Sequence, residues 1–294
     1  MDISVIGGGK WGQALHFAFS QNHTSIITSR TKKDIPNFVT LQKALSNRYL
    51  VVALPAQIVG EWLKNNFKYN NQKVMVAAKG IEESSGRFLN EIFSDFVPSE
   101  NLAYLSGPSF AAEVVKALPT ALVVSSKNRD TAREFCAFFP NFIKSYADDD
   151  IVGAEISGAY KNVLAIASGV CDGLNLGLNA RASLIARGLV EMQRFGLSFG
   201  AKEATFLGLS GAGDLFLTAS STLSRNYRVG EALAKGLKLD KILQELGEVA
   251  EGVLTSRAIS KISKEKNIYT PIAREVSLII DGKSPLDSLR DLLA

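Results

Sequence analysis

One lysine interrupts an apolar, small-residue stretch, ISGAYKNVLAIASGV at positions 156–170. On a helix, the bulky apolar residues of this stretch share one face, and Lys161 lies on the opposite face among Ala, Ser and Gly side chains. Such a face lets a helix or a ligand approach closely, and a desolvated ammonium there needs a partner or loses its proton. The type and place of Lys161 therefore call for a functional partner on this face. A lysine that snorkels from a mostly buried helix stays open as the alternative.

More polar groups stand out downstream, in GAGDLFLT at 211–218 and in the tripeptide Ser224-Arg225-Asn226. Singly, a GAGD carboxylate is also a helix cap, and Ser-Arg-Asn is also a surface turn. Taken with Lys79, they provide an acid/base group, a carboxylate (Asp214) to orient it, and an Arg-Asn pair suited to a phosphate. That set is what the reduction of a phosphorylated ketone needs.

The start of the chain carries a glycine pattern. The run DISVI at 2–6 leads directly into GGGKWG at 7–12, and a helical pattern follows. Gly7 would form a tight turn, Gly9 would admit a pyrophosphate against the backbone, and Gly12 would pack the helix closely. The place between a strand and a helix strengthens a pattern that is weak alone. Dinucleotide binding is predicted in preference to a simple glycine turn.

The second strand ends in TSRTKK at 28–33, without the acidic residue that binds a free ribose 2′-hydroxyl. Arg30 instead suits a 2′-phosphate. NADP(H) is favoured, with dual use of NAD(H) open. The alternative is that Arg30, Lys32 and Lys33 form only a solvated turn.

These groups need a scaffold, and the first half of the chain predicts an α/β sheet. Apolar, β-rich runs at 3–6, 25–28, 50–54, 74–78, 102–105 and 121–125 alternate with amphipathic stretches such as 57–67 and 84–96. This alternation predicts a Rossmann-type parallel sheet with helices on both faces. Lys79 in AAKG and Ser109 in SGPSFA follow strands and would face the nicotinamide end, and Ser109 can cap the next helix.

Helical patterns replace the alternation after residue 150 and persist to the C-terminus. We predict an NAD(P)-binding Rossmann domain at 1–150 and an all-helical, substrate-binding and catalytic domain at 151–294, with a cleft between them. Residues 173–192 have small and apolar faces, which suit either a homodimer contact or an internal core.

Composition narrows the function classes. The net charge of +4 is spread along 294 residues, so a small anionic ligand is expected rather than nucleic acid. The two cysteines, Cys136 and Cys171, indicate a reducing compartment. With two histidines and no cysteine cluster, no metal site is expected. Neither a leader pattern nor a membrane-inserting stretch is recognised, so a cytoplasmic location is predicted.

Nearly end to end, the sequence resembles the NAD(P)-dependent glycerol-3-phosphate dehydrogenases of bacteria. The motifs that carry the resemblance are GGGKWG (7–12), AAKGI (77–81), LSGPSFAAEV (105–114), GAYKNVLAIASGVCDGLNLGLNARASLIARGLVEM (158–192), GLSGAGDLFLTASSTLSRN (208–226) and VAEGVLT (249–255). The resemblance implies an oxidoreductase that reduces dihydroxyacetone phosphate to sn-glycerol 3-phosphate with NADPH or NADH. It also implies a place in glycerophospholipid synthesis.

The resemblance further implies roles for individual residues, with Lys161 as the proton donor and acceptor. The substrate would be bound by Lys79, Gly107, Ser109, Lys161, Asn162, Asp214, Thr218, Ser224, Arg225 and Asn226. The cofactor would be bound by Gly7, Gly9, Lys10, Trp11, Gly12, Arg30, Lys79, Ala111, Arg225, Val249 and Glu251.

Two departures from the family pattern limit this transfer. Lys10 stands where the family usually has a small hydroxyl residue or alanine. Residues 34–46 form a shorter segment than in most relatives and lack their N-x-x-Y-L-P loop. NRYL at 47–50 resembles that motif but runs straight into a strand, so Tyr49 is not assigned to the cofactor.

Two rival functions stay open. One is another two-domain dehydrogenase, of the 3-hydroxyacid or 6-phosphogluconate type, against which the SRN tripeptide after GAGD favours a phosphorylated triose. The other is a regulatory protein that senses NADP(H) without turnover. A sensor has no need of Lys79, Lys161, Asp214 and Arg225 together.

Overall fold

The computed structural model describes residues 2–247 and 250–293. The chain divides into two compact units: unit 1 comprises Met1–Lys79 and Leu89–Glu155, and unit 2 comprises Gly80–Phe88 and Ile156–Ala294. The sequence prediction divided the chain once, at residue 150. Gly80–Phe88 instead groups with unit 2, where the ring of Phe88 packs against Phe199 with 5.1 Å between ring centroids. A local pattern cannot reveal such a long-range contact.

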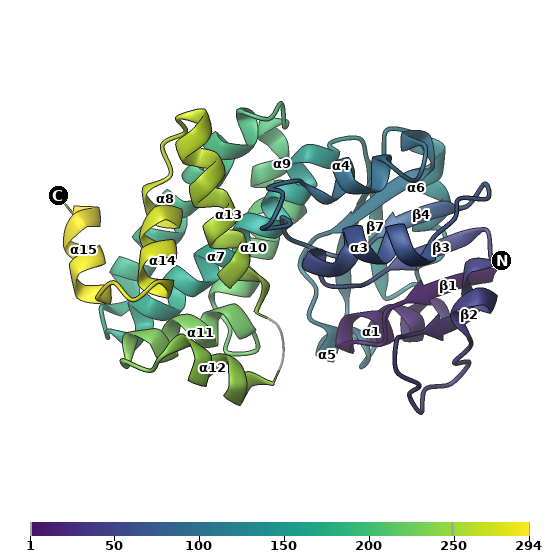
Figure 1. Ribbon diagram of the computed structural model, residues 1–294, viewed down its shortest axis with the longest axis horizontal. Coiled ribbons are helices and arrows are strands. Elements are labelled where there is room, and N and C mark those ends of the chain that lie inside the picture. The colour runs from purple at the N-terminus through teal and green to yellow at the C-terminus, as the bar shows by residue number, and fades with distance from the viewer. Residues whose placement is uncertain (1, 248–249, 294) are drawn as a thin grey trace. The chain divides into compact units, whose positions relative to one another are not determined.

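Unit 1 is built on a mostly parallel sheet, which confirms the predicted fold class (Figure 1). In its described residues the strand order is β2-β1-β3-β4-β5-β6-β7. The strands are β1 (Asp2–Ile6), β2 (Thr24–Thr28), β3 (Tyr49–Val52), β4 (Lys73–Val76), β5 (Leu102–Ser106), β6 (Thr120–Ser125) and β7 (Ile143–Asp148). β6 pairs antiparallel with β5, a departure from the expected parallel sheet. β7 was not predicted, because its sequence, IKSYAD, is polar. In the structure only Ile143 of this strand is fully buried.

Helices cover both faces of this sheet (Figure 1). One core packs β1 residues Ile3 and Val5 against the helices α1 (Lys10–Phe19), α5 (Ala111–Val114) and α6 (Arg129–Cys136). The opposite core packs Ile6 against α3 (Ala56–Asn66) and α4 (Leu89–Ser94). This alternation along β1 is the pattern of a strand covered on both faces. The remaining short helices are α2 (Leu41–Leu45) and η1 (Ser99–Asn101).

The helix predicted at 84–96 is shorter than expected. α4 begins only at Leu89, because Gly86 adopts φ +70° and its N–H closes a turn onto the carbonyl of Glu82. A left-handed glycine of this kind interrupts a helix at little steric cost.

Unit 2 is built from helices. They are α7 (Ile151–Gly173), whose first turn belongs to unit 1, α8 (Gly177–Leu197), α9 (Glu203–Leu207), the π-helical turn η2 (Leu209–Gly213), α10 (Asp214–Ala219), α11 (Arg225–Ala234), α12 (Leu239–Leu246), α13 (Glu251–Lys266), α14 (Pro271–Ile280) and α15 (Pro285–Leu293). α7 is buried at every position from 156 to 171.

A buried carboxylate holds α7 among its neighbours. Glu191 of α8 accepts hydrogen bonds of 2.8 Å from the Tyr160 hydroxyl and from the N–H groups of Ile272 and Ala273 at the start of α14. Burial raises the pKa of the Glu191 carboxyl, and these hydrogen bonds oppose the rise. The residue before Lys161 is thus tied to two other helices.

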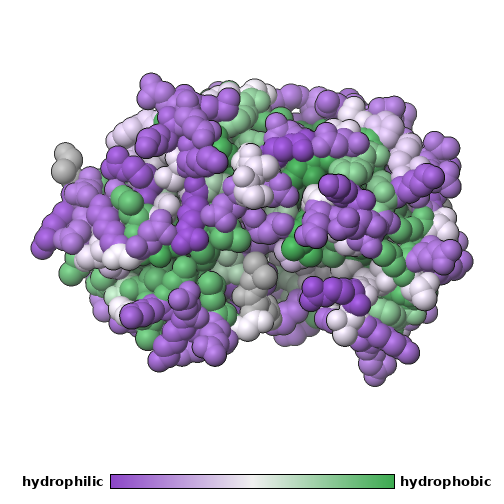
Figure 2. Space-filling view, in the orientation of Figure 1, coloured by the Kyte–Doolittle hydropathy of each residue, from purple (hydrophilic) through white to green (hydrophobic). Residues whose placement is uncertain are grey.

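On the face shown in Figure 2, hydrophilic side chains are scattered over both units and hydrophobic ones lie among them. Across residues 2–247 and 250–293, no helix is both long enough and apolar enough to span a bilayer.

Candidate functional site

Lys161 is buried and paired, which excludes the snorkelling alternative. Lys161 is 7 % exposed, and its Nζ donates to Asp214 Oδ1 at 2.5 Å and to Thr218 Oγ1 at 3.1 Å. Asp214 is 1 % exposed. Desolvation makes a buried ion pair a poor source of stability, so the pair is better explained by chemistry than by folding.

The glycines before Asp214 bring its carboxylate to the lysine. η2 immediately precedes α10, which begins at Asp214. A Cβ on Gly211 would lie 2.2 Å from the carbonyl oxygen of Phe206, so this close approach to α9 requires glycine. π-Helical turns are frequent at functional sites. Thr218 lies four residues after Asp214, on the same helix face, so both side chains reach Lys161.

Helices α7 and α11 touch backbone to backbone. A Cβ on Gly230 of α11 would lie 1.9 Å from the carbonyl oxygen of Ile166, and one on Gly169 of α7 would lie 2.0 Å from that of Tyr227. These glycines therefore fix the distance between the helix of Lys161 and the helix that carries Arg225 and Asn226.

A polar anchor fixes the same crossing at the end of α7. Asp172 Oδ2 accepts hydrogen bonds from the Tyr227 hydroxyl at 2.5 Å and from Arg181 Nη1 at 2.6 Å. Burial and the Asp172 carboxylate raise the pKa of Tyr227 to about 12, so the phenol keeps its proton and donates. Sequence reasoning missed this anchor: Asp172 and Arg181 stand nine positions apart and cannot pair on a single helix.

The start of α11 presents the predicted phosphate residues. Ser224 is the N-cap, and its Oγ accepts from the N–H of Tyr227 at 3.3 Å. Arg225 is exposed at the first helical position, whereas Asn226 is 7 % exposed. Asn226 Oδ1 accepts from the N–H of Gly252 at 3.0 Å, which identifies the other amide atom as the NH₂ donor.

Gly252 is a second residue that sequence reasoning missed. A Cβ there would lie 2.7 Å from the carbonyl oxygen of Asn162 and 2.8 Å from Asn226 Oδ1. Asn162, itself buried, donates from Nδ2 to the carbonyl of Gly158 at 3.3 Å. Gly252 thus joins α7, α11 and the start of α13, where Glu251 is the first residue. Val249 lies outside the described residues.

In unit 1, the glycine loop has two packed glycines and one open one. Gly7 adopts φ +126°, and a Cβ there would lie 2.4 Å from the carbonyl oxygen of Ala53. A Cβ on Gly12 would lie 1.9 Å from the carbonyl oxygen of Gly7. Around Gly9, at the N-cap of α1, no described atom lies within 4 Å of the Cβ position. A loop that is closely packed at Gly7 and Gly12 and open at Gly9, beside a helix N-terminus, fits a pyrophosphate.

The other unit 1 candidates surround the strand ends. Lys10 is exposed, and Trp11 Nε1 donates to the carbonyl of Ala77 at 3.1 Å, which ties the start of α1 to the end of β4. Lys79 Nζ lies 3.5 Å from the carbonyl oxygen of Gly107. Gly107 adopts φ +106°.

The prediction that Ser109 caps the following helix is wrong. Phe110 is the N-cap of α5, and its side chain forms no cap hydrogen bond. The Ser109 hydroxyl instead donates to the carbonyl of Gly107 at 3.3 Å, and Ala111 is the first residue of α5. Ser109 therefore lies beside Lys79, because both contact Gly107.

The short segment after β2 is held by a buried histidine. His16 Nδ1 lies 2.8 Å from Ser25 Oγ, and Nε2 lies 2.9 Å from the carbonyl oxygen of Pro36. Burial lowers the pKa of His16, and the hydrogen bond to Pro36 opposes the shift. Tyr49 is 9 % exposed in β3, with its hydroxyl 3.1 Å from Glu134 Oε2.

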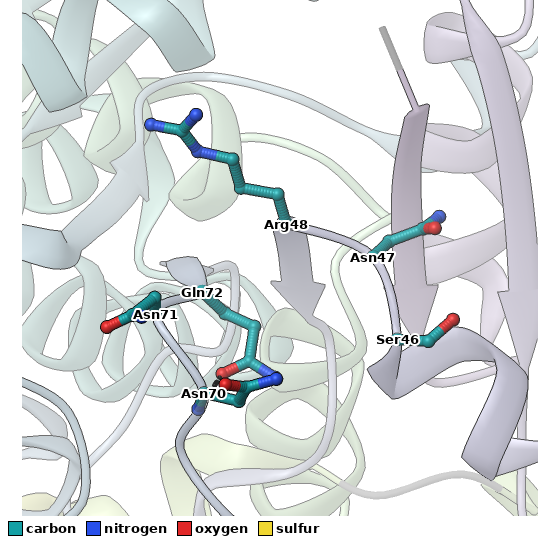
Figure 3. A pocket seen from close by; sticks show the side chains of 6 residues that line it. All are labelled: Ser46, Asn47, Arg48, Asn70, Asn71 and Gln72. Carbon is teal, nitrogen blue, oxygen red and sulfur yellow. Dashed lines mark hydrogen bonds between the residues drawn. The ribbon is translucent and has the colours of Figure 1, made fainter.

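A shallow polar pocket of about 340 Å³ lies at the opposite, amino ends of β3 and β4. It is lined by Ser46, Asn47, Arg48, Asn70, Asn71 and Gln72 (Figure 3). Figure 3 shows Asn70 and Gln72 together, with Arg48 pointing away from them. Gln72 accepts from the N–H of Asn70 at 2.6 Å and donates to the carbonyl of Leu45 at 3.1 Å. Its amide therefore holds the turn together.

In the part of the chain that the structure describes, no group of three or more His, Cys, Asp or Glu side chains could hold a metal ion. Cys136 and Cys171 are free thiols.

Comparisons with known proteins find similarity to one protein family. Residues 29–132 match the model of the N-terminus of NAD-dependent glycerol-3-phosphate dehydrogenase, and residues 150–291 match that of its C-terminus. Glycerol-3-phosphate dehydrogenases [NAD(P)+] of Sulfurimonas denitrificans (99 % of both chains covered) and Nitratiruptor sp. (100 % of this chain, 98 % of the relative) are 60 % and 61 % identical. The crystal structure of glycerol-3-phosphate dehydrogenase from Coxiella burnetii, 29 % identical, covers 99 % of this chain and 98 % of its own, with a TM-score of 0.91.

Proposed function

The chain belongs to the NAD-dependent glycerol-3-phosphate dehydrogenase family, and we propose that it reduces dihydroxyacetone phosphate to sn-glycerol 3-phosphate with NADPH or NADH. It is an oxidoreductase of the CH–OH group, and the reverse oxidation uses the same residues. The buried Lys161–Asp214 pair is the observation that carries the proposed chemistry.

Lys161 is the acid in reduction and the base in oxidation. As the substrate carbonyl carbon gains a hydride, negative charge develops on its oxygen, and Lys161 Nζ donates a proton there. Support for this role comes from the ammonium's burial and from the Asp214 carboxylate 2.5 Å away, which keeps the proton available in a desolvated position. Thr218 Oγ1 accepts from the lysine at 3.1 Å, and Asn162, the next residue along α7, is proposed to complete this group.

The substrate phosphate is proposed to bind Ser224, Arg225 and Asn226. Arg225 offers a guanidinium suited to phosphate oxygens, and the first turn of α11 adds the positive end of its helix dipole. The Asn226 NH₂ is oriented by the Gly252 contact. Lys79, Gly107 and Ser109 are the substrate residues proposed from unit 1.

When bound, the nicotinamide supplies the hydride. The residues present fit such a cofactor, because the open Gly9 position and the packed Gly7 and Gly12 form a cradle that a side chain would fill. Lys10, Trp11, Arg30, Lys79 and Ala111 are the other proposed cofactor residues of unit 1. Arg225 and Glu251 in unit 2, with Val249, are proposed on family resemblance alone.

We further propose a cytoplasmic location, a homodimer, and a supply of sn-glycerol 3-phosphate to glycerophospholipid synthesis. The location is supported by the two free thiols. The dimer is supported by large exposed apolar side chains on α8, among them Leu178 and Val190.

The test is an absorbance assay of purified protein with NADPH or NADH. Oxidation that depends on dihydroxyacetone phosphate, with sn-glycerol 3-phosphate as product, supports the proposal. Turnover only with a 3-hydroxyacid or 6-phosphogluconate would overturn the substrate. Cofactor binding without turnover on any of them would favour the sensor.

A further inference from the structure

The turn after β2 places a lysine directly on the glycine loop. Lys33 Nζ donates to the carbonyl oxygen of Gly8 at 2.7 Å. A Cβ on Gly8 would lie 2.7 Å from Ser29 Oγ and 3.3 Å from Lys33 Cδ. Gly8 is therefore a glycine because this turn lies against it, and the aliphatic stem of Lys33 is part of the contact.

Hydrogen bonds fix this turn at both ends. Ser29 Oγ donates to the carbonyl of Thr31 at 2.7 Å. Further along, His16 contacts the carbonyl of Pro36 at 2.9 Å, and Val39 N–H donates to the carbonyl of Ile27 at 2.9 Å. The position of Lys33 is thus set by the fold, which argues against a merely solvated turn.

The charges here are suited to a phosphate. Arg30 and Lys33 are both exposed, and in the described residues no ion pair is formed by either. An ammonium has three N–H donors, and the bond to Gly8 uses one of them. The glycine loop and the N-terminus of α1 already provide a binding site for the pyrophosphate. Two further cations at the end of β2 therefore point to an additional phosphate, the 2′-phosphate on the adenosine ribose.

We propose that Lys33 is a specificity residue that, with Arg30, selects the 2′-phosphorylated cofactor. Its role is to present an ammonium, held in place by the Gly8 carbonyl, to the 2′-phosphate. This inference rests on the proposed use of NADP(H), but it does not depend on the substrate or on turnover.

The experiment measures binding of 2′,5′-ADP and 5′-AMP by calorimetry, because these fragments differ only in the 2′-phosphate. Wild-type protein is compared with Lys33→Ala and with Lys32→Ala, the matched control from the same turn. Losing one charge-assisted hydrogen bond is expected to weaken 2′,5′-ADP binding by about tenfold in Lys33→Ala. Binding of 5′-AMP to Lys33→Ala, and of both fragments to Lys32→Ala, is expected to change less than about twofold.

Three outcomes would overturn the proposal. Equal weakening of both fragments in Lys33→Ala would mean that the lysine only shapes the loop. Unchanged 2′,5′-ADP binding would remove it from the site. A wild-type protein that binds both fragments equally would show no selection. Failure of the proposed function looks different: 2′,5′-ADP is preferred, but dihydroxyacetone phosphate is not reduced. Unfolding curves of each variant separate these results from loss of fold.

Discussion

The two units hold their candidate groups by different physics. In unit 1, a continuous loop of six residues presents backbone, and Gly7 and Gly12 are required there because added carbon atoms would collide with Ala53 and Gly7. In unit 2, Lys161 of α7 and Asp214 of α10 are separated by 53 positions and meet only in the folded structure. A backbone cradle is sensitive to an added methyl group, whereas a buried ion pair is sensitive to the loss of either partner. We therefore expect added methyl groups to impair cofactor binding in unit 1, and loss of a charged side chain to impair catalysis in unit 2.

The largest effect is expected from Asp214→Asn in unit 2. The amide leaves the buried Lys161 ammonium without its counter-charge and changes its orientation. We expect kcat to fall by about 100-fold or more and unfolding free energy by about 3 kcal/mol. Binding of the cofactor fragment 2′,5′-ADP should stay unchanged, because the groups proposed to hold its phosphates, the glycine loop with Arg30 and Lys33, lie in unit 1. Steady-state kinetics within about threefold of wild type would contradict the role of Asp214.

The glycine loop gives the complementary test in unit 1. Gly9→Ala places its methyl group in open space at φ −72°, so stability should stay at the wild-type level. Cofactor affinity should fall by about tenfold, because the methyl group occupies the proposed pyrophosphate position.

Gly12→Ala is the matched variant, since its methyl group meets the Gly7 carbonyl at 1.9 Å. It should lose about 1–3 kcal/mol of stability as well as affinity. Denaturant unfolding and calorimetric titration separate the two. Equal behaviour of both variants would contradict the distinction between packed and open glycines.

A smaller effect is expected at the anchor between α7 and α11. Asp172→Asn weakens the hydrogen bonds to Tyr227 and Arg181, which position the start of α11. We expect KM for dihydroxyacetone phosphate to rise by about three- to tenfold with kcat nearly unchanged. Tyr227→Phe should reproduce the rise in KM. A fall in kcat without a change in KM would show that the anchor acts on the reacting groups instead.

The smallest effect concerns the pH dependence of stability in unit 1. Burial lowers the pKa of His16 below 6.5, so the unfolded chain binds a proton before the folded one does. This contribution to stability is full above pH 6.5, the pKa of the unfolded chain, and is lost as the pH falls from there through the lower pKa of the folded state. His16→Gln should flatten the curve of unfolding free energy between about pH 8 and 5. A curve as steep as that of wild type would contradict a neutral His16.

The sequence predicts the unit 1 loop better than the unit 2 helix crossings, and the reason is distance along the chain. Gly7, Gly9 and Gly12 form one contiguous motif, so their roles can be assigned without a fold. Lys161 and Asp214 each stand out locally, but their contact needs the tertiary structure. Asp172, Tyr227 and Gly252 act only through helix crossings, and no local pattern distinguishes them from ordinary helix residues.

The secondary structure shows the same limit. β7 and the antiparallel direction of β6 depend on pairing at the edge of the sheet, which a polar sequence such as IKSYAD does not reveal. Family resemblance supplied the remaining site residues, since spacing alone permits but does not require them.

Replacement of the whole buried pair is the sharpest test of proton transfer by Lys161. Lys161→Met combined with Asp214→Leu exchanges the ion pair for apolar side chains and leaves no buried charge, so the fold should be retained. We expect a kcat for dihydroxyacetone phosphate reduction that is lower by about 100- to 10,000-fold, with 2′,5′-ADP bound as in wild type. Turnover within about tenfold of wild type in this folded double variant would contradict proton transfer by Lys161.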